Sequence, residues 1–308
     1  MRRTLAPIRA ARGLPKWLLW TGIGIVALFV AMAVFAPLIA RYSFTSYRSN
    51  GTPFPKTGHP SAAHWFGTNV SQYDVFARVI YGARTELQVV LLSLVLAVAA
   101  GVLLGLISGW IGGIVDRLLV LVMDTLFAFP YLLLAIVISF LLQSSPLGGG
   151  IVTAAVAITA VYVPQYFRVV RNSVLSVKQE TYVDAARALG ARPVTIVSRY
   201  IFSNVIQTVP VIATLNAADA ILTLAGLGFL GYGVQPTVAA EWGYDVQKAI
   251  PDVASGVWWT AVFPGGAIVL LVLGLTLVGE GLNDVVNPVL RRRPMMKVRL
   301  PEPAEPSP

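Results

Sequence analysis

The amino-acid sequence predicts an all-α membrane protein that crosses the bilayer six times. The first indication is composition, because 56% of the 308 residues are hydrophobic and only 12% are charged, whereas soluble domains average about 25% charged residues. The second is that six stretches are long and apolar enough to span a bilayer, which takes roughly 20 residues. The chain contains no cysteine, which excludes disulfides, thiolate metal sites and cysteine nucleophiles.

The six predicted transmembrane helices lie at about residues 17–40, 86–110, 117–142, 149–170, 205–230 and 258–284. The first follows a basic N-terminus, as the apolar region of a secretory signal peptide does. It is longer than the roughly 7–15 apolar residues of a cleaved signal, and no clear small-residue cleavage site follows it. We therefore expect it to be retained as a membrane helix.

The distribution of Lys and Arg predicts that both termini are cytoplasmic. Basic residues collect in cytoplasmic loops, and most of the 23 Lys and Arg lie near the two termini and in residues 168–204. The net charge of +9 then reflects topology and contact with anionic lipid headgroups rather than nucleic-acid binding. The predicted organisation is a cytoplasmic N-terminus (1–16), a first span (17–40), an extracytoplasmic segment (41–85), a five-helix core (86–284) with a cytoplasmic loop at 171–204, and a tail (285–308) with a disordered Pro-rich end.

Two polar stretches, 41–85 and 231–257, lie on the outer side in this orientation. Asp74 precedes an apolar run and predicts an N-capped helix, which either lies on the membrane face or leads directly into the second span. We expect His64 to pack with Trp65 near the interface. Several aromatic residues in and after the second stretch suit an interfacial belt, namely Trp242, Tyr244, Trp258 and Trp259.

The loop at 171–204 is polar, yet its composition favours helix. Residues 178–189 contain three alanines and a leucine, Ala185, Ala186, Ala188 and Leu189, which have high helix propensity. Four apolar side chains recur there at helical spacing on one face; they are Tyr182, Ala185, Ala186 and Leu189. Gly190 suits the left-handed end of a helix, and Pro193 suits the first turn of a second one at about 193–201.

The face formed by these four residues has two interpretations. The helix could rest on lipid headgroups, but interfacial helices favour bulky Trp, Phe and Leu on the buried face. Alanine side chains instead permit close approach of a protein surface. We favour a helix that docks into a groove on a protein partner.

Polar residues inside the predicted spans mark a candidate translocation path. Asp124 lies in the third span, and Asn216 and Asp219 lie in the fifth. A mid-span Asp costs about 2.5–3.5 kcal/mol on insertion scales, so both aspartates should face the helix bundle or a water-filled path. Hydrogen bonding between helices is the alternative interpretation.

The sequence favours neither an enzyme nor a metal site. The two histidines, His59 and His64, lie in the outer segment, and the intramembrane carboxylates have no His or Ser partner at motif spacing. A nucleotide-binding Walker A loop needs Gly-Lys before Ser or Thr, and no lysine here follows a glycine. We therefore expect no catalytic residue, no metal ligand and no nucleotide site in this chain.

The 171–204 loop resembles the EAA loop of ABC importer permeases. The spacing E-x-x-x-D-A-A-x-x-x-G begins at Glu180, continues through Asp184, Ala185 and Ala186, and ends at Gly190. Asp184 stands where the family usually has glutamate. The family's I-L-P-N ending occurs at 201–204 as Ile-Phe-Ser-Asn, and the missing proline concerns the local kink rather than the assignment.

A wider set of motifs, in order along nearly the whole chain, resembles the dipeptide, oligopeptide and nickel C-type permease subfamily. They lie at 64–68 (HWFGT), 74–78 (DVFAR), 81–84 (YGAR), 226–228 (GLG), 233–236 (GVQP), 241–243 (EWG), 258–259 (WW), 263–265 (FPG) and 281–284 (GLND). The sequence departs from the subfamily at Asn69, Ser71, Gln72 and Tyr73, where an acid, leucine, glycine and arginine are usual.

The resemblance implies a type I ABC importer permease fold in a bacterial or archaeal cell membrane. It implies that the EAA loop is a coupling helix, with Glu180, Asp184, Ala185, Ala186 and Gly190 acting on a cytoplasmic ATPase. ATP and Mg²⁺ would then be bound by partner subunits. The implied partners are a B-type sister permease, two ATPase subunits or a fused pair, and an extracytoplasmic solute-binding protein that the 231–257 loop could meet.

The sequence does not identify the transported solute. The subfamily implies di- or oligopeptides, and nickel or another small solute is the alternative within the same class. An ATPase-independent channel or a membrane scaffold is the alternative from a different class.

Overall fold

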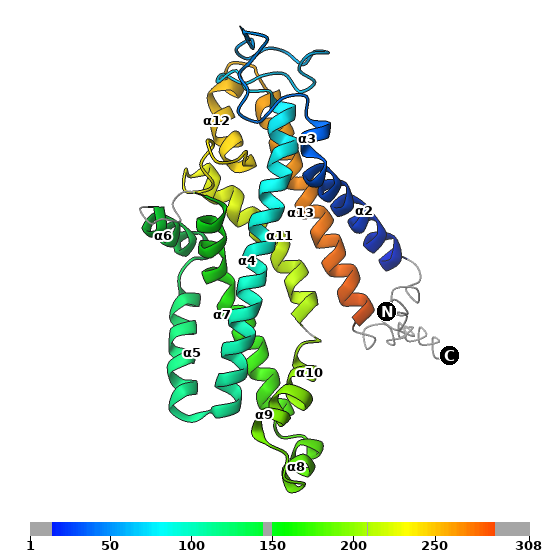
Figure 1. Ribbon diagram of the computed structural model, residues 1–308, viewed down its shortest axis with the longest axis vertical. Coiled ribbons are helices and arrows are strands. Elements are labelled where there is room, and N and C mark those ends of the chain that lie inside the picture. The colour runs from blue at the N-terminus through cyan, green and yellow to red at the C-terminus, as the bar shows by residue number, and fades with distance from the viewer. Residues whose placement is uncertain (1–13, 144–149, 208, 287–308) are drawn as a thin grey trace, which may run out of the picture.

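The structure is a computed structural model that describes residues 14–143, 150–207 and 209–286. These residues are mostly helical, and Figure 1 shows the long helices aligned roughly along one direction. The helices are α2 (Leu14–Val34), α3 (Ala36–Ile39), α4 (Val75–Ile111), α5 (Gly113–Ala128), α6 (Tyr131–Gln143), α7 (Ile151–Val177), α8 (Thr181–Ala188), α9 (Pro193–Thr195), the π-helix η1 (Ile196–Ile201), α10 (Phe202–Val205), α11 (Val209–Phe229), α12 (Trp242–Ala254) and α13 (Trp259–Val286). The strands β1 (Arg48–Ser49) and β2 (Thr52–Pro53) form a small antiparallel hairpin.

Five helices in the described part of the chain are long and apolar enough to cross a membrane, namely α2, α4, α7, α11 and α13. A sixth span would have to combine α5 and α6, whose axes differ by 100°. The prediction of one continuous helix at 117–142 is therefore wrong. The break falls at Phe129, which is extended with ψ 140°, because a residue that precedes a proline is sterically disfavoured in the helical region.

The bundle is built around α4 and α7, which touch along glycine positions. Gly101, Gly105 and Gly109 recur every fourth residue on α4 and face α7. A Cβ added at Gly101 would lie 2.5 Å from the Cβ of Tyr166, and one at Gly105 would lie 2.9 Å from the carbonyl oxygen of Phe167. Small residues at this spacing let membrane helices approach closely, so α4 and α7 form one packed unit.

The helix that contains the second span begins earlier than the predicted span at 86–110. Asp74 caps it, because the Asp74 carboxylate accepts a hydrogen bond from the backbone N–H of Ala77 at 2.7 Å. The helix α4 then continues unbroken to Ile111. Asp74 therefore leads directly into the span, and the alternative of a separate helix lying on the membrane face is wrong.

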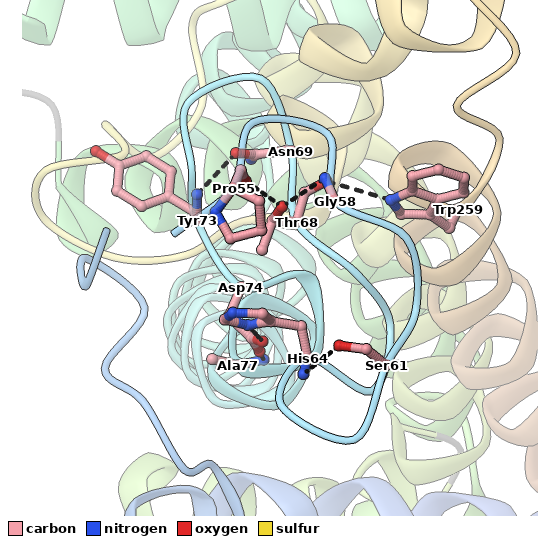
Figure 2. A network of polar contacts seen from close by, with 10 residues as sticks. All are labelled: Pro55, Gly58, Ser61, His64, Thr68, Asn69, Tyr73, Asp74, Ala77 and Trp259. Carbon is pink, nitrogen blue, oxygen red and sulfur yellow. Dashed lines mark hydrogen bonds and ion pairs between the residues drawn. The ribbon is translucent and has the colours of Figure 1, made fainter. Parts of the chain in front are cut away.

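The outer segment before α4 is held by a polar network (Figure 2). His64 Nδ1 lies 2.8 Å from the second carboxylate oxygen of Asp74, and both side chains are buried. The ring of His64 packs against Tyr42 and Phe54, with centroids 5.4 and 4.6 Å apart. Trp65 packs against Phe76 instead, so the expected pairing of His64 with Trp65 is replaced by one that fixes the start of α4.

Two of the tryptophans expected in an interfacial belt are core residues. Trp242 is fully buried, and its Nε1 donates to the carbonyl oxygen of Val79 in α4 at 3.0 Å. Trp259 is 2% exposed, and its Nε1 donates to the carbonyl oxygen of Thr68 at 3.2 Å (Figure 2). Trp258 is half exposed. The belt prediction is therefore wrong for Trp242 and Trp259, which join the outer segments to the helix bundle.

Glu241 fixes the start of α12 from a fully buried position. Its carboxyl group accepts hydrogen bonds from the backbone N–H groups of Gly243 at 2.6 Å and Tyr244 at 2.8 Å. Burial raises the pKa of the Glu241 carboxyl to about 8, because removal from water disfavours the charged form; the two N–H donors offset only part of this effect. The uncharged acid is thus the form that suits this site at neutral pH.

The raised pKa of Glu241 predicts that stability falls as the pH rises. Its ordinary pKa is near 4.5, so the stabilisation is complete below that pH and is lost as the pH rises through about 8. We expect the melting temperature of the protein in detergent to fall between roughly pH 4.5 and pH 8, from the ordinary pKa to the raised one. Glu241→Gln keeps the acceptor without the charge and should flatten part of that fall. Glu241→Ala should lower stability at all pH values, and a Gln variant with the full wild-type fall would contradict the prediction.

Candidate functional site: the α8 tip and the cleft beside α11

The predicted helix, turn and second helix are present in the 171–204 loop. Helix α8 lies at the opposite end of the molecule from α12 (Figure 1). It starts after Glu180, whose backbone is extended, and Gly190 then reverses the chain with φ +78°. A positive φ is the conformation that favours glycine. Pro193 occupies the first turn of α9, as predicted.

The second helix is irregular over 196–201, just before the two positions, 202 and 203, at which the sequence departs from the I-L-P-N pattern. The helix predicted at about 193–201 is a single turn of α9 followed by the π-helix η1. Asn204, in α10, donates to the carbonyl oxygen of Tyr200 at 2.6 Å and to the hydroxyl of Tyr182 at 3.2 Å. The bond to Tyr182 ties α10 to α8, so the segment is distorted without a proline and remains attached to α8.

The structure divides the apolar face that the sequence predicts on α8. Ala186 is 7% exposed and Val183 is fully buried, and both belong to the hydrophobic core. The other three members of the predicted face, Tyr182, Ala185 and Leu189, remain exposed. Leu189 is 88% exposed, and Val194, just beyond the turn, is 78% exposed. We call these four exposed residues (Tyr182, Ala185, Leu189 and Val194) the α8 tip.

The five residues expected to contact an ATPase are not equivalent. Glu180, Asp184, Ala185 and Gly190 are exposed, whereas Ala186 packs inside its own chain. The carboxylate of Asp184 pairs with Arg187 one turn later at 2.9 Å. Exposed pairs of this kind contribute only about 0–1 kcal/mol, so the Asp184 carboxylate remains available for exchange with a partner.

Trp110, near the end of α4, connects α8 to the bundle. The charged groups of Lys178 and Arg187 each lie 5.6 Å from the centre of its indole ring. Lys178 Nζ also donates to the Trp110 carbonyl oxygen at 2.9 Å. Exposed cation–π contacts contribute about 0.5–1 kcal/mol each. Sequence reasoning missed this residue, although a tryptophan at the end of an apolar run was a visible signal.

A cleft of about 580 Å³ opens between the α5–α6 break, α7 and α11. Its wall is mainly aromatic and aliphatic; it is lined by Leu126, Phe127, Ala128, Phe129, Pro130, Tyr131, Leu134, Val161, Tyr162, Gln165, Asp219 and Leu222. Asp219 contributes a carboxylate to this otherwise mostly apolar wall. The break at Phe129 and Pro130, which separates α5 from α6, forms one side of the cleft.

The three predicted path residues occupy different positions relative to the cleft. Asp219 lines it. Asp124 is outside the lining and pairs with Arg168 of α7 at 2.8 Å, and the Arg168 guanidinium lies 3.9 Å from the ring centre of Phe127. Asn216 is 2% exposed and also outside the lining. The structure therefore brings Asp219 into the cleft, places Asp124 beside it and leaves Asn216 among packed helices.

A second ion pair, which sequence reasoning missed, joins the same two helices. Arg171 of α7 donates to both carboxylate oxygens of Asp116 in α5, at 2.6 and 2.7 Å. Ser108 of α4 donates to the same carboxylate. The two parallel hydrogen bonds of a bidentate pair fix its geometry as well as strengthening it. Arg171 therefore holds α5 against α7 in addition to adding to the basic balance of the loop.

Comparison with known proteins identifies the family. Residues 101–292 match the family described as binding-protein-dependent transport system inner membrane component. The chain is 38% identical over 270 residues to the dipeptide transport system permease protein DppC of Alkalihalophilus pseudofirmus, covering 88% of this chain and 85% of that protein. It is 35% identical over 268 residues to the probable D,D-dipeptide transport system permease protein DdpC of Escherichia coli K12, covering 87% and 86%.

A third relative is named for a different substrate. The chain is 34% identical over 267 residues to the glutathione transport system permease protein GsiD of Pectobacterium atrosepticum, covering 86% of this chain and 85% of that protein. The matches extend over most of both chains, as the ordered motifs of the sequence predicted. The chain therefore belongs to the family of inner-membrane components of binding-protein-dependent transport systems, within its DppC-like group of permease subunits.

Proposed function

We propose that this chain is one of two membrane-spanning subunits of an ATP-driven importer of di- or oligopeptides in the cell membrane. The names of these three relatives refer to dipeptides, D,D-dipeptides and glutathione, all of which are peptides. The observation that carries the proposal is the α8 tip, where Leu189 and Val194 expose 88% and 78% of their surfaces at one end of the bundle. Such residues have a physical reason to be exposed if another subunit covers them.

The coupling step follows from the position of α8. An ATPase subunit receives the α8 tip in a groove, with Glu180, Asp184, Ala185 and Gly190 at or beside the contact and Ala186 supporting the helix from inside. Moving a two-state equilibrium from 1:99 to 99:1 takes roughly 5.5 kcal/mol of differential interaction. ATP-driven closure of the ATPase pair supplies it, and the contacts of Lys178 and Arg187 with Trp110 carry the displacement of α8 to α4.

The proposed topology has six crossings with both termini in the cytoplasm. The third crossing is made by α5 and α6 together, as a broken span. Figure 1 shows that α2 begins and α13 ends away from α12, toward the side on which α8 lies. This arrangement supports a shared cytoplasmic side for α8 and the two ends of the chain, in agreement with the distribution of basic residues.

The proposed complex contains further chains. A B-type sister permease completes the translocation path, to which the cleft with Asp219 and the nearby Asp124 contribute. Asn216 lies among packed helices and would act on the path only through α11. Two ATPase subunits, or a fused pair, bind ATP and Mg²⁺, and a solute-binding protein meets the outer end formed by α12 and the segment before α4.

Reconstitution tests this function. The chain is co-expressed with its neighbouring permease, ATPase and binding-protein genes, purified as a complex and placed in proteoliposomes. Uptake of labelled dipeptides should require ATP and the binding protein, and ATPase activity should rise when the loaded binding protein is added. Uptake of nickel and not of peptides would support the alternative substrate instead. A chain that purifies without any ATPase and conducts solute unaided would overturn the proposal.

A further inference from the structure

We propose that the cleft beside α11 binds the free amino group of a peptide through the carboxylate of Asp219. The inference rests on the proposed peptide transport and adds a specific contact to it. It assigns to this subunit a direct role in recognising the peptide during passage, in addition to forming a wall of the path.

No cationic side chain in the described part of the chain neutralises the carboxylate of Asp219. Within the described residues, no Lys, Arg or His lies within ion-pair distance of it. The hydroxyl of Thr223 donates to the backbone oxygen of Asp219 and not to its side chain. The two aspartates of the neighbouring helix α5 behave differently, because Asp116 pairs with Arg171 and Asp124 pairs with Arg168.

The surroundings of Asp219 strengthen its attraction for a cation. The adjoining wall is formed by apolar side chains such as Phe127, Phe129 and Leu222, which are each about half exposed, and Asp219 itself is exposed at the protein surface. Coulombic attraction between unit charges rises several-fold when the effective dielectric constant falls from about 80 to about 20. An ammonium group that enters the cleft therefore meets a favourable partner.

The dimensions of the cleft fit a small peptide. Its volume of about 580 Å³ lies within the range of roughly 300–1,000 Å³ that is typical of small-molecule sites. Tyr162 forms part of the wall, and its hydroxyl lies 3.3 Å from Thr223 Oγ1 of α11. This contact holds the α7 and α11 sides of the cleft together around Asp219.

The chemistry of the relatives' named substrates agrees with an ammonium site. A dipeptide, a D,D-dipeptide and glutathione differ in side chains, chirality and one linkage, but each has a free α-amino group. A single carboxylate in a mainly aromatic and aliphatic wall recognises that shared group without a requirement for handedness. A site built from several convergent hydrogen bonds would discriminate among these peptides far more strongly.

A single cysteine provides a direct test, since the chain has none of its own. Leu222 lines the cleft and is 49% exposed, so Leu222→Cys is introduced and the complete transporter is assembled in nanodiscs. The rate of alkylation by N-ethylmaleimide is measured by mass spectrometry of this chain. The probes are alanyl-alanine and N-acetyl-alanyl-alanine, each supplied in excess and without the binding protein.

We expect alanyl-alanine to slow alkylation at least fivefold and the acetylated probe to have little effect. Adding Asp219→Asn should abolish the protection, and Asp219→Glu should restore much of it. Glu280→Gln is the matched control, because Glu280 is an exposed carboxylate on α13 outside the cleft, and it should retain protection.

Equal protection by both probes, or none by either, would overturn the inference. Comparison of the two probes on the transporter with native Asp219 remains decisive if the Asp219→Asn complex does not assemble. ATPase stimulation by the loaded binding protein is recorded on the same preparation. If ATPase stimulation and uptake are normal but the two probes protect equally, only the Asp219 contact is disproved. If the unmodified complex shows neither ATPase stimulation nor uptake, the proposed function is disproved.

Discussion

Leu189→Asp is expected to reduce ATP-driven uptake at least tenfold while leaving the protein folded and inserted in the membrane. Leu189 is 88% exposed at the end of α8, so the substitution removes little packing within the chain. In the proposed importer the same position would enter a groove of the ATPase, where an unpaired carboxylate must lose its water. A tenfold effect corresponds to about 1.4 kcal/mol, which is at the low end of the usual cost of burying a polar group.

The measurement is uptake in proteoliposomes together with co-purification of the ATPase. Leu189→Met is the matched control, because it retains an apolar side chain of similar volume and should transport normally. Thermal stability of the isolated subunit should be the same for all three proteins. A Leu189→Asp complex that binds its ATPase and imports at the wild-type rate would show that the α8 tip is not the docking surface.

The structure makes Leu189 a cleaner test than Ala186. A bulky residue at Ala186 would also impair coupling, but Ala186 is 7% exposed and belongs to the core, so its replacement disturbs the packing that supports α8. Gly190→Pro would alter the chain path as well, because the native φ of +78° is inaccessible to proline. At Leu189, by contrast, docking can be changed while internal packing is left alone.

Local features of the fold could be predicted where neighbouring residues determine them. The cap at Asp74, the left-handed turn at Gly190 and the helix start at Pro193 depend on residues within one turn of each other. The apolar stretches likewise place five long helices close to where they are found. The same local reasoning predicted the α8 helix. The prediction of which α8 side chains form its exposed apolar face was wrong in part, because their burial depends on η1, which packs against α8 from beyond the turn.

Features that depend on distant residues were not predictable from pattern. The Trp242 and Trp259 rings are buried because their N–H groups reach the carbonyl oxygens of Val79 and Thr68, far away in sequence. From hydropathy alone, both tryptophans are expected at the membrane–water interface. The break between α5 and α6 was also missed, since an average over the 117–142 segment hides the effect of Pro130. That break forms one wall of the cleft, so the site depends on it.

Gly243→Ala is expected to destabilise the protein by about 3 kcal/mol or more. Gly243 lies in the first turn of α12, directly against α11. A Cβ there would lie 2.0 Å from the carbonyl oxygen of Ala225 and 2.6 Å from its carbonyl carbon. These are backbone atoms of a long helix, so they cannot rotate away. Relief requires α12 to move, which separates Glu241 and Trp242 from their buried positions.

The sign of the Gly243→Ala effect is the informative part, because glycine to alanine in an unobstructed helix stabilises it by up to about 1 kcal/mol. Gly266→Ala provides this reference, since Gly266 lies in α13 and an added Cβ meets no atom within 4 Å. Samples in detergent are heated and the temperature at which the protein aggregates is measured. Relative to the wild type, we expect this temperature to be lower for Gly243→Ala and equal or higher for Gly266→Ala. A Gly243→Ala protein as stable as the wild type would mean that α12 is not seated against α11. The outer end would then have to be held by the sister subunit or by lipid rather than by this chain's own packing.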